Sequence, residues 1–166
     1  MRWLVIALLT AVPLAAFAAG GSPDESFYKS AAEAGMGEVE LGNLAAQKSS
    51  DPKVKDFAQT MVKDHSAANE KLRALASSKE ISLPTGAGAA NTMTKGKLEV
   101  LAGGAFDKSY IKGQVKAHVD TVALLHKEIA SGQDADAKAF ARSVLPTVQG
   151  HLKAARAIAA EQTGKT

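Results

Sequence analysis

The segment from residue 111 to residue 129 carries the strongest helical pattern in the sequence. His118 lies in the middle of it, and a buried imidazole needs a hydrogen-bond partner or a metal ion, because unpaired nitrogens cost about 1 to 3 kcal/mol. The sequence therefore predicts a helix that buries one polar ring on its inner face. The apolar residues of this face, spaced alternately by four and three as in an amphipathic helix, are Ile111, Val115, Val122, Leu125 and Ile129.

Three further segments show the same arrangement, with one polar residue on an otherwise apolar helical face. Helices are predicted from about residue 22 to 49, from about 52 to 80 and from about 134 to 162. Each of these predicted helices starts at a side chain that can cap it. The short connections near residues 50 and 133 make the first and second long helices antiparallel neighbours, and likewise the third and fourth. The capping residues are Ser22, Asp51 and Asp134, and the polar residues on the inner faces are Glu38, His65 and His151.

The connection between the second and third long helices is harder to interpret. Residues 81–94 are predicted to be a loop, residues 95–102 a short extra helix, and the third long helix is expected to begin near Ala105, after Gly103 and Gly104. The connection could cross the end of the molecule or run along its whole length. In either case the prediction is an all-α protein, an antiparallel four-helix bundle over residues 22–162 with a long connection and a short extra helix.

The four inward polar residues are predicted to lie at similar depth. At about 1.5 Å per residue, Glu38 and His65 lie roughly 18 to 22 Å from the first tight turn, and His118 and His151 roughly 24 to 26 Å from the second. All four can therefore meet near the middle of the bundle. Three imidazoles and one carboxylate suit a single zinc, copper, iron or nickel ion better than calcium or magnesium. A hydrogen-bonded polar network is the alternative, and His126 is expected at its rim.

Several functional classes are disfavoured. The chain of 166 residues has a net charge of only +3, so neither nucleic acid nor an anionic membrane is expected as a partner. It has no cysteine, and the Gly-x-Ser-x-Gly nucleophile motif is absent. The Glu-x-x-His motif of di-iron bundles is also absent, because valine lies three residues before His65, His118 and His151. No catalytic residue is assigned, and no protein partner is identified.

The first 18 residues resemble a secretory signal peptide. Arg2 is the charged end, residues 4–14 are the apolar run, and residues 16–18 (AFA) form the cleavage pattern. The apolar run is too short for a comfortable membrane span. The mature chain is therefore expected to be periplasmic or secreted, without an integral membrane segment.

Several short motifs occur in a fixed order along the chain. They are GEVELG (37–42), VKDFA (54–58), MVKDH (61–65), FD (106–107) with His118, and LP (145–146) with HL (151–152). This set resembles the "domain of unknown function 4142" family over nearly all of the mature chain. The resemblance implies a ferritin-like four-helix bundle in an exported protein, and no established activity. Two hypotheses follow, a metal-binding protein and a non-enzymatic periplasmic interaction or stress protein with a buried histidine network.

Overall fold

The computed structural model describes residues 22–164, and the predicted signal peptide, residues 1–18, lies outside the described residues. The described chain is all-α. No helix within it is long and apolar enough to span a lipid bilayer. Its five helices are α1 (Pro23–Lys48), α2 (Pro52–Ser78), α3 (Gly88–Glu99), α4 (Gly103–Ser131) and α5 (Ala135–Thr163).

Side-chain caps fix the starts of three long helices, as the sequence predicts. Ser22 Oγ accepts a hydrogen bond from Glu25 N at 3.1 Å, and the Asp51 side chain accepts one from Lys53 N at 2.8 Å. Asp134 accepts in the same way at the start of α5. A cap satisfies a backbone N–H that has no partner within the helix. The helix starts are therefore encoded locally.

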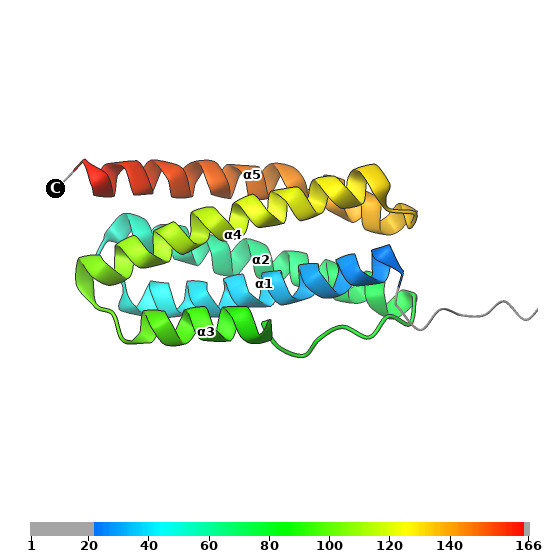
Figure 1. Ribbon diagram of the computed structural model, residues 1–166, viewed down its shortest axis with the longest axis horizontal. Helices are drawn as coiled ribbons and strands as arrows, with labels where there is room; N and C mark the ends of the chain where they lie inside the picture. Colours follow the sequence, from blue (N-terminus) through cyan, green and yellow to red (C-terminus); the bar gives the residue numbers. More distant parts are fainter. Residues whose placement is uncertain (1–21, 165–166) are drawn as a thin grey trace, which may run out of the picture.

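The long connection runs lengthwise along the molecule (Figure 1). The chain leaves the end of α2, returns along α1 through α3, and enters α4 at the opposite end of the bundle. Asn91 of α3 donates a hydrogen bond from Nδ2 to the carbonyl of Glu33 in α1, at 3.3 Å. The two open possibilities for this connection are thus resolved, and α1–α2 and α4–α5 are antiparallel pairs.

The predicted boundaries in this region were wrong. Helix α3 begins at Gly88, inside the predicted loop, and ends at Glu99. Its apolar pattern is weak, and it forms because it packs against α1, with Leu98 buried at 5% exposure. Helix α4 begins at Gly103, before the predicted start near Ala105, and the φ of +53° at Gly103 favours glycine.

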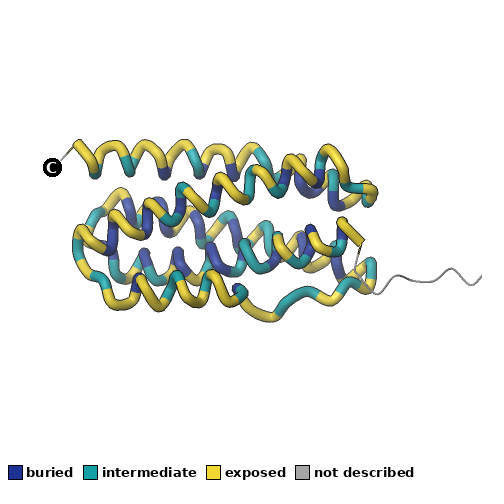
Figure 2. Tube along the Cα trace, in the orientation of Figure 1, coloured by how far each residue is buried: buried dark blue, intermediate teal, exposed yellow. Residues whose placement is uncertain are grey.

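A polar layer divides the interior into two apolar clusters. The buried positions face inward on the four long helices (Figure 2). On every long helix the polar residue lies between members of the two clusters, as His65 lies between Met61 and Leu72 on α2. One cluster includes Leu41, Ala45, Met61, Phe106, Ile111 and Ala155. The other includes Phe27, Leu72, Leu125, Phe140 and Val148. The buried polar residues between them are Glu38, His65, Gln114, His118 and His151.

Two further buried carboxyl groups, those of Asp24 and Glu128, lie at the end of the bundle near the α4–α5 turn. Asp24 accepts hydrogen bonds from the backbone N–H groups of Gln133 (2.8 Å) and Asp134 (3.1 Å). Glu128 is 5% exposed. Burial, together with the neighbouring Asp24, raises the pKa of Glu128 to about 7. The Glu128 side chain is therefore protonated, and a hydrogen-bond donor, over a pH range in which ordinary glutamates are ionised.

Replacing Glu128 with glutamine should change how stability depends on pH. The folded-state pKa is raised, so the folded protein holds a proton that the unfolded chain has lost above about pH 4.3. The stability that this proton contributes is present below that pH and is lost as the pH rises through about 7. Glu128→Gln keeps a neutral donor, and should exceed the parent in unfolding free energy by roughly 1 to 3 kcal/mol at pH 8 but match it near pH 4.5.

Urea unfolding at a series of pH values measures this difference. Glu70→Gln, which changes an exposed glutamate of α2, is the matched control and should follow the parent. A constant difference between Glu128→Gln and the parent at all pH values would contradict the raised pKa.

Candidate metal centre

Three histidines from three different helices meet in the polar layer. His65 comes from α2, His118 from α4 and His151 from α5. Their ring centroids are 5.6 Å (His65–His118), 5.5 Å (His65–His151) and 5.5 Å (His118–His151) apart. One nitrogen from each ring lies within 4.8 Å of the other two. The structure therefore brings together the three histidines that the sequence predicts to meet, and we call them the histidine triad.

The three rings of the triad are buried. The exposed fractions are 7% for His65, 1% for His118 and 7% for His151. Burial is the largest cause that lowers the pKa of His65 to about 3, with the other two rings adding to it. Burial also lowers the pKa of His118 to about 4. These two rings are therefore neutral near pH 7, which is the form that binds metals.

The partner of His118 determines which of its nitrogens is protonated. Its Nδ1 lies 2.9 Å from the backbone carbonyl oxygen of Gln114, one helical turn earlier. A carbonyl oxygen only accepts hydrogen bonds, so Nδ1 carries the proton and Nε2 carries a lone pair. His118 Nε2 is buried and has no hydrogen-bond partner.

His151 is oriented by a carboxylate. Its Nε2 lies 3.0 Å from Oδ2 of Asp64, on α2. In the neutral ring, which is the form that binds a metal, Nε2 is therefore the donor and the lone pair lies on Nδ1. This Nδ1 is also buried without a partner. A carboxylate behind the imidazole is the arrangement that orients histidine ligands at many metal sites.

The unpaired nitrogens cannot satisfy one another fully. His118 Nε2 and His151 Nδ1 are both acceptors, so no hydrogen bond can form between them. His65 Nε2 is the third buried nitrogen without a partner. Each such group costs about 1 to 3 kcal/mol when it is left dry. A cation among the three nitrogens removes this cost, because each nitrogen then donates its lone pair to the ion.

The spacing of the triad is close to that of a metal site. A tetrahedral ion with bonds of about 2.0 to 2.1 Å requires nitrogens about 3.4 Å apart. The present nitrogens lie within 4.8 Å of one another. The three rings would therefore have to approach one another when an ion binds, and neutral imidazoles suit zinc, copper or iron. By donor type and spacing, the residues fit a transition-metal ion.

Glu38, the fourth predicted ligand, lies near the protonated nitrogen of His118 and not near its lone pair. Its Oε1 is 3.7 Å from His118 Nδ1, whereas the lone pair of this ring is on Nε2. Its Oε2 accepts a hydrogen bond from Gln114 Nε2 at 2.7 Å. Burial raises the pKa of Glu38 to about 7, and the bond from Gln114 opposes this shift. The carboxylate is part of the buried layer, and its role as a ligand stays a prediction.

Two residues that support the site were not recognised from the sequence alone. Gln114 precedes His118 by four residues, so helical spacing places both on one face and could have revealed it. Asp64 is adjacent to His65 in the chain, and no periodic signal connects it to His151 on another helix. His126, expected at the rim, is exposed and outside the triad.

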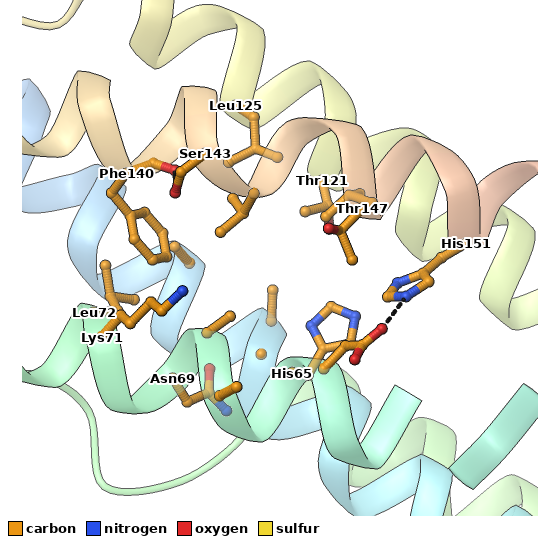
Figure 3. A pocket seen from close by; sticks show the side chains of 18 of the residues that line it. His65, Asn69, Lys71, Leu72, Thr121, Leu125, Phe140, Ser143, Thr147 and His151 are labelled. Atoms are coloured by element: carbon orange, nitrogen blue, oxygen red, sulfur yellow. Dashed lines mark hydrogen bonds and ion pairs between the residues drawn. The ribbon is translucent and has the colours of Figure 1, made fainter. Parts of the chain in front are cut away.

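A cavity of about 270 Å³ adjoins the triad. His65 and His151 lie at one end of it, and Leu72 and Phe140 at the other (Figure 3). All four long helices contribute to its walls. The triad is therefore supported by Gln114 and Asp64 and borders an internal space.

Comparison with solved structures finds helical bundles of the same fold at low sequence identity. The structure described as "CopM in the Cu(II)-bound form" matches with a TM-score of 0.70 and 14% identity, over 83% of this chain and 96% of that chain. A DUF305 protein of Streptomyces coelicolor, described as a candidate secreted protein, matches with a TM-score of 0.72 and 14% identity, over 86% and 94% of the two chains.

A DUF305 fragment from Deinococcus radiodurans matches with a TM-score of 0.71 and 12% identity, over 85% of this chain and 97% of that chain. At such identities these matches establish the fold alone. A search of proteins with curated descriptions finds no significant match.

The sequence itself gives a more specific assignment. Residues 10–158 match the model of a family described as "Domain of unknown function (DUF4142)". This range covers most of the 166 residues. The chain therefore belongs to the DUF4142 family, and its helical bundle is similar to those of CopM and the DUF305 proteins.

Proposed function

We propose that this protein binds one transition-metal ion through the histidine triad, with copper as the first candidate and zinc or iron as alternatives. The observation that carries the proposal is the meeting of three buried imidazoles, each of which offers a nitrogen within 4.8 Å of the other two. Each ring also has one buried nitrogen without a hydrogen-bond partner. The orientation of two rings by Gln114 and Asp64 supports it. A bound copper ion would supply a one-electron redox centre or a form in which copper is stored.

The choice of copper draws on the structural comparison. CopM, which has the same fold, is described in both Cu(II)-bound and Cu(I)-bound forms. Neutral imidazoles bind both copper and zinc, and copper(II) binds more tightly than zinc at a given nitrogen site. Glu38 is the fourth residue of the proposed site. From its position we infer that it supports His118, and it becomes a ligand only if its carboxylate turns.

The second candidate function is a purely structural role, in which the buried histidines form a hydrogen-bond network within a periplasmic interaction or stress protein. The bonds of His118 to Gln114 and of His151 to Asp64 favour it. It leaves three buried nitrogens unpaired, at about 1 to 3 kcal/mol each. The metal hypothesis accounts for these nitrogens and is therefore preferred.

We also propose that the bundle is of the ferritin-like type and that the chain is exported. Two antiparallel pairs joined by a single lengthwise connection are typical of ferritin-like bundles. The signal pattern in residues 1–18 and the similarity to the candidate secreted DUF305 protein support export.

Alanine substitutions in the triad test the metal site. The parent should bind about one Cu(II) per chain, and saturating ion should raise its melting temperature, because a ligand at 100 times its Kd adds about 2.7 kcal/mol. His65→Ala, His118→Ala and His151→Ala should each lose most of the bound copper and of the melting shift. Elemental analysis and calorimetry measure the two quantities, and His126→Ala, which changes an exposed histidine, should behave like the parent.

The same variants separate the two functions. A structural network predicts that each substitution destabilises the metal-free protein by roughly 1 to 3 kcal/mol, with no dependence on added copper or zinc. If the triple alanine variant keeps the stoichiometry and the melting shift of the parent, the metal hypothesis is wrong.

Asp64→Asn tests the support of His151. The substitution removes the charge behind the imidazole, and loss of such a partner costs about 10- to 100-fold in metal affinity. Competition with a chelator should measure this loss, while the saturated stoichiometry should stay at about one ion per chain. Asp56→Asn, an exposed change on the same helix, should bind as the parent does. Equal affinity in the two variants would remove Asp64 from the site.

Export is tested by the N-terminus of the mature protein. Cleavage after the AFA pattern should leave a chain that begins near Ala19 or Gly20. Mass spectrometry of protein recovered outside the cytoplasm measures this directly. An exported form that retains Met1 would contradict the signal-peptide assignment.

A further inference from the structure

The cavity adjoins only one side of the triad. His65 and His151 line it, and His118 is not among its lining residues. Two of the three proposed ligands therefore flank the cavity while His118 approaches from α4, so one side of the triad faces an internal space (Figure 3). Metal sites with three protein ligands and one open position exchange small molecules at that position.

The cavity opens between α2 and α5. The exposed residues among its lining are Ala67 and Lys71 on α2 and Ser143 and Thr147 on α5. The deeper walls come from small or apolar side chains of all four long helices. A small molecule can therefore enter from the surface without separating either antiparallel pair.

The chemistry of the walls indicates what kind of molecule fits. Two of the wall hydroxyls already donate to backbone carbonyls, Thr121 to Ala117 and Ser143 to Phe140. The only acidic residue of the lining, Asp64, is bonded to His151, and the only basic one, Lys71, lies at the mouth. The remaining polar side chains are Thr147, which is exposed at the mouth, and Asn69, which lies against Gly35 of α1. Because few polar groups line the cavity, a strongly hydrated molecule would lose its water with little replacement. The deep apolar walls are Ala31, Ala34, Ala68, Leu72, Leu125, Phe140, Val144 and Val148.

The size of the cavity sets an upper limit on its occupant. A cavity of about 150 Å³ holds benzene. The cavity here is about 270 Å³ and therefore accepts one substituted aromatic ring or a short aliphatic chain. It is too small for a large cofactor.

We propose that the cavity binds a small apolar molecule with one metal-binding donor atom, which coordinates the metal ion held by the triad as an exchangeable fourth ligand. The inference rests on the proposed metal function. It goes further in assigning the cavity as a binding site and in naming the chemical class of its ligand.

The experiment compares two probes on the Cu(II)-loaded protein, imidazole and 4-phenylimidazole. Both offer the same donor nitrogen, but only the second has a ring that fills the cavity. Titration followed by the visible ligand-field band of copper should give saturable shifts with both. The Kd of 4-phenylimidazole should be lower by about tenfold or more, since burial of the phenyl ring supplies at least the corresponding free energy.

A larger side chain that fills the cavity should remove the difference in Kd between the two probes. Ala68 lines the cavity one turn after His65, and Ala68→Leu should weaken 4-phenylimidazole by about tenfold while changing the Kd of imidazole by less than about twofold. Ala154→Leu, an exposed change on α5, is the matched control and should bind both probes as the parent does. The comparison of the two probes on the parent decides the question even if Ala68→Leu does not fold.

The outcomes separate this inference from the proposed function. If copper binds but neither probe shifts the band, or both probes bind equally, the cavity is not a ligand site and the metal site stands. If the copper-loaded Ala68→Leu variant binds 4-phenylimidazole as tightly as the parent, the ring lies elsewhere and the inference is wrong. If no ion binds to the parent, both proposals fail.

Discussion

The burial of a polar layer in the middle of the bundle is the constraint on which the rest of the structure depends. Three imidazoles, a carboxyl group and an amide lie between two apolar clusters, and each must be desolvated when the chain folds. The apolar clusters on both sides provide the stabilisation that tolerates this cost. Within the layer, Gln114 satisfies two neighbours, since its amide donates to Glu38 and its backbone carbonyl accepts from His118. The network leaves four buried atoms of the layer unpaired, one nitrogen on each histidine of the triad and Oε1 of Gln114.

The long helices could be predicted because their signals are local. The caps at Ser22, Asp51 and Asp134 and the spacing of apolar residues depend only on neighbours in the chain, and the structure agrees with both. The lengthwise course of the connection and the start of α3 at Gly88 depend on contact with α1. No pattern within residues 81–99 contains that information, because tertiary packing determines the helix there.

The site shows the same division between local and tertiary information. Helical period placed the three histidines on inward faces, and equal depth brought them together. Period does not specify which nitrogen of a ring faces a neighbour, because that depends on partners such as Asp64 on another helix. For this reason the sequence predicts that Glu38 belongs to the same layer as the triad but not that it lies beside Nδ1 of His118.

The two sides of the layer differ, and this difference bears on function. On the side of α1, Glu38 and Gln114 are hydrogen-bonded to each other, and α3 packs close to Gly37, where an added Cβ would meet Asn91. On the side of α2 and α5, the triad borders a cavity that reaches exposed residues. A purely structural site gains from closure on all sides, since every open side admits water that competes for the ligands. Asp64 holds His151 on the side of the cavity, and Gln114 holds His118 from α4. Under the proposed function, the space beside His65 and His151 would leave room for a small molecule that exchanges at the bound metal ion.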